Sequence, residues 1–267
     1  MPTVLAVSPH LDDAVFSCGG TLARLVAGGW RVVLATLFTR SVPDPQGFAL
    51  ACQLDKGLAA DVDYMALRRA EDREAARHLG ITEVLWLDLP EAPHRGYHSA
   101  PALFAGARDG DDIWRDAAAC LAELLGRVEP DLVLSCQGLG NHVDHIQAVR
   151  ALLALDGLGA GVAGRTAWWR DLPYAIRVPG ATPVPELPRG LDGLAVAIDG
   201  QVELKGRASA AYATQVGFQF GGAGKVLPTL AAFAAREGQA ACSAGVVERF
   251  VAPAGIRTTL SSVPGGV

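Results

Sequence analysis

The sequence lacks the features that would suit a nucleic-acid or membrane partner. Its 23 Lys and Arg residues are outnumbered by 28 Asp and Glu residues, and the net charge is -5. The basic residues are scattered, so no patch is evident that would bind a phosphate backbone or an anionic lipid surface. No apolar run reaches the roughly 18 residues that suggest a membrane span. By elimination the composition favours a small-molecule partner, with no nucleic acid and no membrane.

Signals for export and for disulfide bonds are also missing. The segment after Met1 has none of the basic region, apolar stretch and cleavage site of a signal peptide, so we expect a cytoplasmic protein. The five cysteines stand singly, with no C-x-x-C pair. This argues against a disulfide framework and a cysteine zinc site, and we interpret them as reduced structural thiols. A monomer and a homo-oligomer both stay open.

What the chain does have is a regular alternation of short apolar segments with helical ones. Its 267 residues, half of them hydrophobic, suit one large α/β domain. The predicted strands are 3–8, 31–38, 83–87 and 131–136, and the predicted helices are 21–27, 64–79, 112–128 and 145–155. Near-continuous apolar strands in βα order predict a Rossmann-like, mostly parallel sheet with helices on both faces.

The last third of the chain is rich in glycine and proline. We interpret residues 1–160 as a Rossmann-like catalytic core and residues 161–267 as a C-terminal extension packed on the same domain. The extension is expected to hold strands at 174–178, 194–198 and 246–251 and helices at 205–215 and 226–236. Two long loops, 40–62 and 90–110, are expected to shape a binding site.

A histidine and aspartate motif, Pro9-His10-Leu11-Asp12-Asp13, follows the first predicted strand directly. In a parallel sheet the carboxyl ends of the strands open into the ligand crevice. Taken alone, the motif is equally compatible with a turn and a helix N-cap, since aspartate favours that position.

A second motif, Asn141-His142-Val143-Asp144-His145, follows the fourth predicted strand and would open into the same crevice. Two histidines and a carboxylate from these loops would give three protein ligands and leave one position open, as catalytic zinc sites require. Zinc lowers the pKa of its water to near 7, which makes a nucleophile available at neutral pH.

These motifs resemble the two signatures of the LmbE-like, or PIG-L, family of zinc-dependent N-deacetylases, A/P-H-P-D-D-E and H-P-D-H. The resemblance extends, weakly beyond residue 160, to Gly19-Gly20-Thr21-Leu22, Arg68, Glu71, Ala75-Ala76, Leu79-Gly80, Lys205, Tyr212 and Thr214-Gln215. It implies that His10, Asp13 and His145 bind Zn²⁺. Such ligands do not select strongly for zinc, so Fe²⁺ is an alternative.

The resemblance also implies three catalytic residues. Asp12 would be the general base for the attacking water, protonated His142 would stabilise the oxyanion, and Asp144 would orient and charge-balance His142.

Three positions depart from the family pattern. Leu11 and Val143 replace prolines, and Ala14 stands where a glutamate is common. None is an implied ligand, so activity is still expected, whereas any role of that glutamate is in doubt.

Four further residues are candidates for binding substrate. Arg68 is proposed because of its R-x-x-E resemblance, although an arginine on such a helix is more often a solvated side chain. Glu91, Arg95 and Tyr97 lie in the second long loop, where they could hydrogen-bond to sugar hydroxyls or simply face solvent.

The sequence therefore predicts a hydrolase that removes an N-acyl group, in the first instance acetyl, from an amino sugar or a glycoconjugate. One alternative is an amidase that acts on a thiol S-conjugate. A second, of another class, is a non-catalytic Rossmann-like nucleotide-binding module. The second requires G-x-G-x-x-G after the first strand, where the sequence has histidine and aspartates instead.

Overall fold

The computed structural model describes residues 1–261 and is built around one seven-stranded sheet of order β3-β2-β1-β4-β5-β7-β6. Its strands are β1 (Thr3–Ser8), β2 (Arg31–Thr36), β3 (Glu83–Trp86), β4 (Leu132–Cys136), β5 (Thr166–Trp169), β6 (Asp192–Ala197) and β7 (Val247–Ala252). Strands β1 to β5 are parallel, while β7 is antiparallel to both β5 and β6. The last three strands therefore extend the sheet that the first four begin.

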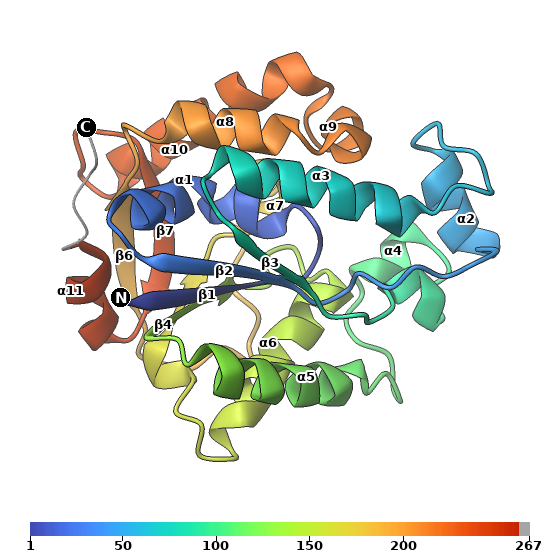
Figure 1. Ribbon diagram of the computed structural model, residues 1–267, viewed down its shortest axis with the longest axis horizontal. Coiled ribbons are helices and arrows are strands. Elements are labelled where there is room, and N and C mark those ends of the chain that lie inside the picture. Colours follow the sequence, from blue (N-terminus) through green and yellow to red (C-terminus); the bar gives the residue numbers. More distant parts are fainter. Residues whose placement is uncertain (262–267) are drawn as a thin grey trace.

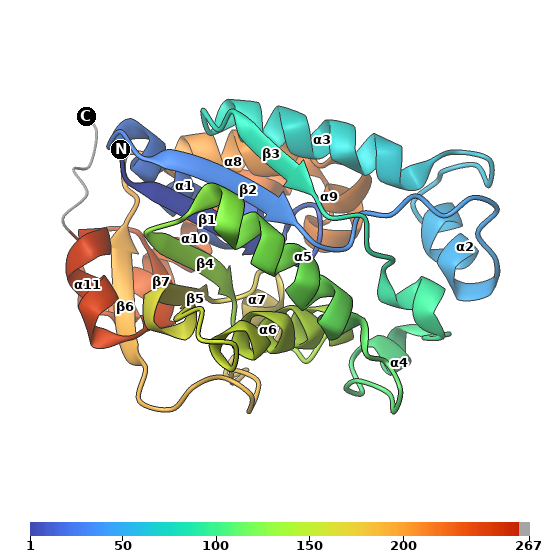
Figure 2. The same ribbon diagram turned by 60° about the horizontal axis from the view of Figure 1, so that its bottom comes forward.

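Helices cover both faces of the sheet (Figures 1 and 2). One face carries α1 (Asp13–Ala27), α3 (Tyr64–His78), α8 (Val202–Ala210), α9 (Ala213–Phe220) and α10 (Ala223–Ala240), and the other carries α5 (Ile113–Val128) and α6 (Val143–Asp156). The shorter helices are α2 (Gly47–Leu54), α4 (Ala100–Leu103), α7 (Tyr174–Arg177), α11 (Ala254–Ser261) and the 3-10 helices η1 (Ala92–Arg95) and η2 (Ala163–Arg165). The prediction of a Rossmann-like, mostly parallel sheet is confirmed.

The double covering explains why the central strands are continuously apolar. Every residue of β1 and β4 is buried, since a parallel strand between two helical layers has no wet face. Over the described residues no helix combines the length and the apolar character that a membrane span needs.

The local predictions failed mainly where glycine and proline are dense. The predicted strand at 174–178 is wrong, because this segment forms the short helix α7, and β5 was not predicted at all. Helix α1 begins at Asp13 and not at Thr21. Residue 20, inside this helix, is a glycine because a Cβ atom there would lie 2.9 Å from the Ile198 side chain.

A buried ion pair joins α8 to β7. Lys205 Nζ lies 2.7 Å from Glu248 Oε1, and both side chains are 3% exposed. The Glu248 carboxylate also accepts hydrogen bonds from the backbone N–H groups of Gly20 and Thr21 and from the Thr21 hydroxyl. These donors are free because α1 is kinked at Cys18, so Glu248 caps the second half of the helix.

Removing this carboxylate is expected to destabilise the fold. Glu248→Ala leaves the Lys205 ammonium buried without its partner, which should cost about 3–5 kcal/mol of unfolding free energy. Glu203→Ala is the matched control, because Glu203 is an exposed glutamate in the first turn of α8, and it should cost less than about 1 kcal/mol. Urea unfolding measures both, and equal losses in the two variants would show that the pair contributes nothing special.

Candidate functional site

Parallel strands bring the two sequence motifs together at one edge of the sheet. β1 and β4 are neighbours, and the segments that follow them end in the first turns of α1 and α6. The rings of His10 and His142 have centroids 5.0 Å apart, and those of His10 and His145 have centroids 5.4 Å apart. The long loops carrying α2 and α4 stand beyond this edge, at the opposite end of the molecule from the N-terminus (Figure 1).

One carboxylate oxygen lies between two of the histidines. Asp13 Oδ2 is 3.1 Å from His10 Nδ1 and 3.2 Å from His145 Nε2, and it also accepts a hydrogen bond from the His10 backbone N–H. Asp13 and His145 are 4% and 0% exposed. Ionised Asp13 is favoured although burial opposes it, because the charge of His145 and the hydrogen bond from His10 lower its pKa.

The other nitrogen of each histidine meets a second carboxylate. His10 Nε2 is 2.9 Å from Asp144 Oδ2, and His145 Nδ1 is 2.6 Å from Asp171 Oδ1. Asp171 was not anticipated from the sequence. It follows β5 by two residues, so recognising that strand would have placed an aspartate at the same sheet edge as the two motifs.

Two of the contacts among the three inner donor atoms have the spacing of metal ligands. Ligands held at zinc's usual bond lengths of about 2.0–2.1 Å in a tetrahedron lie about 3.3 Å apart, close to the two distances from Asp13. His145 Nε2 is buried without a hydrogen-bond partner of suitable geometry, so it is free to bind an ion. The nitrogens of His10, His142 and His145 also lie within 4.8 Å of one another, which makes a three-histidine set the alternative.

Asp12 lies beside this cluster and forms an ion pair with an arginine. Its Oδ2 is 3.8 Å from Arg68 Nη2, and Arg68 Nη1 is 2.5 Å from Glu91 Oε1. Burial raises the pKa of Asp12 to about 7, with the charge of Asp13 acting in the same direction. The structure thus brings Arg68 and Glu91 to the cluster, and it gives Asp12 a pKa near that of a general base at neutral pH.

His142 is held in a defined neutral form. Its Nδ1 accepts the backbone N–H of Asp144 at 3.2 Å, so the ring proton of the neutral tautomer is on Nε2. Burial, followed by the charge of His10, lowers the pKa of His142 to about 3. The protonated His142 that the family resemblance implied stays a prediction.

The expected partnership of Asp144 with His142 also takes a different form. The Asp144 carboxylate contacts His10 Nε2, the Ala92 N–H and, at 2.8 Å, Arg95 Nη1. Its side chain therefore orients His10, while its backbone orients His142.

Arg95 and Tyr97 belong to the supporting structure of the second loop. Arg95 pairs with Asp144 and with both oxygens of Asp111, and the Tyr97 hydroxyl donates to Asp111 and accepts the N–H of Arg108. Tyr97 is fully buried. Both side chains therefore contact other residues of the protein, whereas the sequence suggested that they face a substrate.

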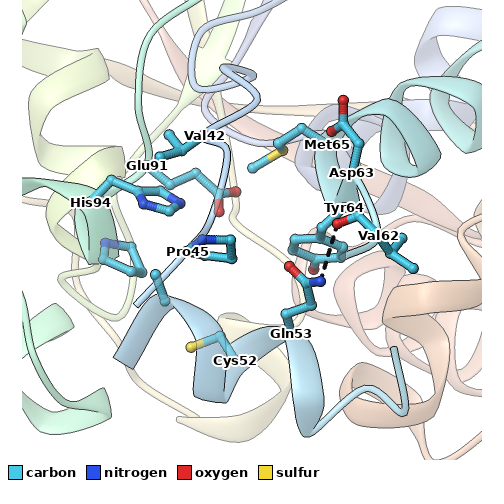
Figure 3. A pocket seen from close by; sticks show the side chains of 12 residues that line it. Val42, Pro45, Cys52, Gln53, Val62, Asp63, Tyr64, Met65, Glu91 and His94 are labelled. Carbon is cyan, nitrogen blue, oxygen red and sulfur yellow. Dashed lines mark hydrogen bonds between the residues drawn. The ribbon is translucent and has the colours of Figure 1, made fainter. Parts of the chain in front are cut away.

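A pocket opens next to Glu91, between α2, the start of α3 and η1 (Figure 3). Its accessible volume is about 30 Å³, which is room for about one or two water molecules. It is lined by Val42, Pro45, Ala49, Cys52, Gln53, Val62, Asp63, Tyr64, Met65, Glu91, Pro93 and His94. Both long loops contribute residues to it.

Residues 5–155 match the family model described as PIG-L: GlcNAc-PI de-N-acetylase. The match covers more than half of the chain, and this protein therefore belongs to the PIG-L family.

Relatives within the family show what it is similar to. A 2'-N-acetylparomamine deacetylase of Streptomyces fradiae is 34% identical over 64% of this chain and 57% of that protein. A 1D-myo-inositol 2-acetamido-2-deoxy-alpha-D-glucopyranoside deacetylase of Kineococcus radiotolerans is 28% identical over 62% of this chain and 49% of that protein. The chain thus spans about half the length of these curated relatives.

A solved structure covers nearly the whole chain. The zinc-inhibited form of a teicoplanin deacetylase aligns with a TM-score of 0.77 and 26% identity, over 93% of this chain and 97% of that one.

The contacts of Arg95 predict a structural role that can be separated from substrate binding. Arg95→Ala leaves Asp144 and Asp111 buried without their cation, which should cost about 3–5 kcal/mol of unfolding free energy. Arg108→Ala is the control: this exposed arginine of the same loop donates only to backbone oxygens, and its loss should cost less than about 1.5 kcal/mol. If Arg95 served substrate alone, Arg95→Ala would unfold at the wild-type urea concentration.

Proposed function

We propose that the protein is a zinc-dependent hydrolase that removes the N-acetyl group of an amino sugar or an amino-sugar conjugate. The observation that carries the proposal is the position of Asp13 Oδ2 between His10 Nδ1 and His145 Nε2. Each of these histidines is oriented by an outer carboxylate, an arrangement typical of histidine metal ligands.

His10, Asp13 and His145 would hold the ion. A bound zinc ion would supply Lewis-acid chemistry and make water acidic near neutral pH. Because a carboxylate and two imidazoles do not select strongly among divalent metals, Fe²⁺ stays an alternative.

The chain's own groups supply the proton transfers. Asp12, with its raised pKa, accepts a proton from the attacking water and returns it to the departing amine. Arg68 keeps Asp12 in position through their 3.8 Å ion pair. His142 donates its Nε2–H to the oxygen that becomes negatively charged as the amide carbon turns tetrahedral.

The nature of the substrate is supported by the names of the relatives. The two curated relatives are named for deacetylation of N-acetylated amino-sugar conjugates. Arg68, 3.8 Å from Asp12, and Glu91, which pairs with Arg68, would contact the hydroxyls of such a sugar. The cytoplasmic location stays a prediction, and the oligomeric state stays open.

One of the two rival functions fits the site less well. A nucleotide phosphate would have to bind at the start of α1, where the carboxylates of Asp12 and Asp13 would repel it. An amidase for a thiol S-conjugate would use the same metal chemistry, so a substrate panel must decide between it and the deacetylase.

Metal content and amine release together test the proposal. Wild type should bind about one zinc-type ion and release amine from N-acetylglucosamine conjugates but not from an amide-linked S-conjugate. His145→Ala should lose the metal and the activity, because a ligand is removed. Asp12→Asn should keep the metal while its kcat falls about 10²–10⁴-fold, since the proton acceptor is gone.

The metal should be titrated from below one equivalent, because a structural neighbour is described in a zinc-inhibited form. Elemental analysis of the loaded protein provides the count. If wild type binds no metal after zinc, iron and cobalt have each been supplied, the two motifs are structural and the proposal is wrong.

The outer carboxylate of Asp171 predicts an effect on metal affinity. Asp171→Asn removes the charge that orients His145 and should weaken metal binding about 10–100-fold. A chelator competition measures this affinity without any substrate. Asp116→Asn, on the exposed surface of α5, should bind as tightly as wild type, and an equal affinity of Asp171→Asn would show that Asp171 serves packing alone.

A further inference from the structure

The segment 212–215, with the sequence Tyr-Ala-Thr-Gln, lies at the start of α9 and has no part in the proposed reaction. It follows α8, which runs alongside α3 (Figure 1). The Tyr212 hydroxyl donates to Asp72 at 2.7 Å, and Thr214 donates its backbone N–H and its hydroxyl to Glu71 at 2.8 and 2.7 Å. Asp72 and Glu71 both belong to α3, so this segment from the last third of the chain is hydrogen-bonded to that helix.

The last residue of the segment, Gln215, is attached to the first residue of α3. Its amide nitrogen donates to the Tyr64 hydroxyl at 2.7 Å and to the Thr214 hydroxyl oxygen at 2.8 Å. Gln215 is 4% exposed, and burial raises the pKa of Tyr64 well above its usual range, so the tyrosine stays neutral. Since an amide nitrogen has two donors, both are used on fixed partners, and the outer end of the Tyr64 side chain is tethered to α9.

The ring of Tyr64 in turn supports the guanidinium of Arg68, one helical turn further along α3. Arg68 Cζ lies 5.4 Å from the centre of the ring, within the roughly 6 Å of a cation–π contact. Glu91 binds only Nη1 of this guanidinium. Nη2 is 3.8 Å from Asp12, which is longer than a hydrogen bond, and among the described residues Nε has no hydrogen-bond partner. The tyrosine ring therefore provides the second contact that fixes Arg68.

These contacts form a series that runs from Gln215 through Tyr64 and Arg68 to Asp12. Arg68 and Asp12 are 4% and 5% exposed, and between such buried charges the interaction depends strongly on distance. A shift of about 1 Å in a group that positions the reacting atoms can lower a rate about 10²-fold. Loss of the tether at Gln215 would therefore be felt at Asp12.

We propose that Gln215 is a positioning residue of this hydrolase, which acts through the ring of Tyr64 to hold the Arg68 guanidinium beside Asp12. The segment 212–215 then sets the rate of the reaction as well as the packing of α9 on α3. The inference rests on the proposed function, because it takes Asp12 as the group that accepts the proton from water. Neither Gln215 nor Tyr64 needs to touch the substrate.

Amine release by the metal-loaded protein tests the effect on rate. Gln215→Leu removes the donor at similar volume, and we expect kcat to fall about 5-fold or more while KM changes less, because the error lies in the geometry of the reacting groups. Tyr64→Leu removes the ring and should lower kcat at least about 10-fold. Tyr64→Phe restores the ring without its tether, so its kcat should lie between those of wild type and Tyr64→Leu.

A double variant tests whether Gln215 acts through Tyr64. In Tyr64→Phe the amide has lost its acceptor at residue 64, so the further change Gln215→Leu should leave kcat at the value of Tyr64→Phe. Changes at independent sites would instead multiply their effects on kcat, and that outcome would contradict the relay.

Tyr212→Phe is the matched control, because it removes another hydrogen bond between the same segment and α3, the one to Asp72. We expect it to lower the midpoint of urea unfolding as Gln215→Leu does and to keep kcat near the wild-type value. The inference is overturned if Gln215→Leu keeps the wild-type kcat, or if Tyr212→Phe lowers kcat equally, since a general loosening of α9 would then explain both.

A signal from Arg68 itself separates failure of the relay from failure of the proposed function. The ¹⁵N NMR signal of its Nε–H group, assigned by its loss in Arg68→Lys, needs neither substrate nor turnover. Because an aromatic ring shifts the signals of nearby nuclei, Gln215→Leu and Tyr64→Leu should move it, whereas Tyr212→Phe should leave it in place. An unmoved signal in both of the first two variants would refute the relay, whereas amine release from no substrate would refute the proposed function.

Discussion

A continuous series of buried carboxylates, each paired with an arginine or a histidine, is the constraint on which the site depends. Starting at the second loop, the order is Asp111, Arg95, Asp144, His10, Asp13, His145 and Asp171. Each member would be costly to bury alone, and each is compensated by its neighbours. This series of paired side chains runs along the sheet edge from loop 90–110 to the segment after β5. The fold must therefore bring these separate segments within hydrogen-bond distance of one another.

The sheet meets this requirement through its topology. β1, β4 and β5 are adjacent and parallel, so the residues that follow them emerge at the same edge. His10 and Asp13 follow β1, His145 follows β4 and Asp171 follows β5. The segments that follow these buried strands thus carry the charged groups, whereas the strands themselves contain no charged residue.

This division explains which features were predictable from the sequence. Apolar strands followed by histidine and aspartate motifs are local signals, and they located the cluster of His10, Asp13 and His145. Asp171 was missed because β5 has only four residues and lies in a glycine-rich stretch, where neither periodicity nor length marks a strand. Orientation was also out of reach, since no local pattern tells that Asp144 turns its carboxylate to His10.

The second loop illustrates the same limit. The sequence grouped Glu91, Arg95 and Tyr97 by their polar character, but the structure separates them. Glu91 faces Arg68 and the pocket, whereas Arg95 and Tyr97 hold Asp111 and Asp144. Burial and pairing decide between these roles, and both depend on residues far away in the chain.

Segment 40–62 lies outside this series of paired side chains and contributes no strand to the sheet. Gly47 and Gly57, at its two bends, have positive φ angles and open space around them. Insertions, deletions and substitutions between them can therefore accumulate without disturbing the buried charges. Because this segment lines the pocket beside Glu91, such changes would reshape the wall of that pocket and leave the ends of the buried strands as they are.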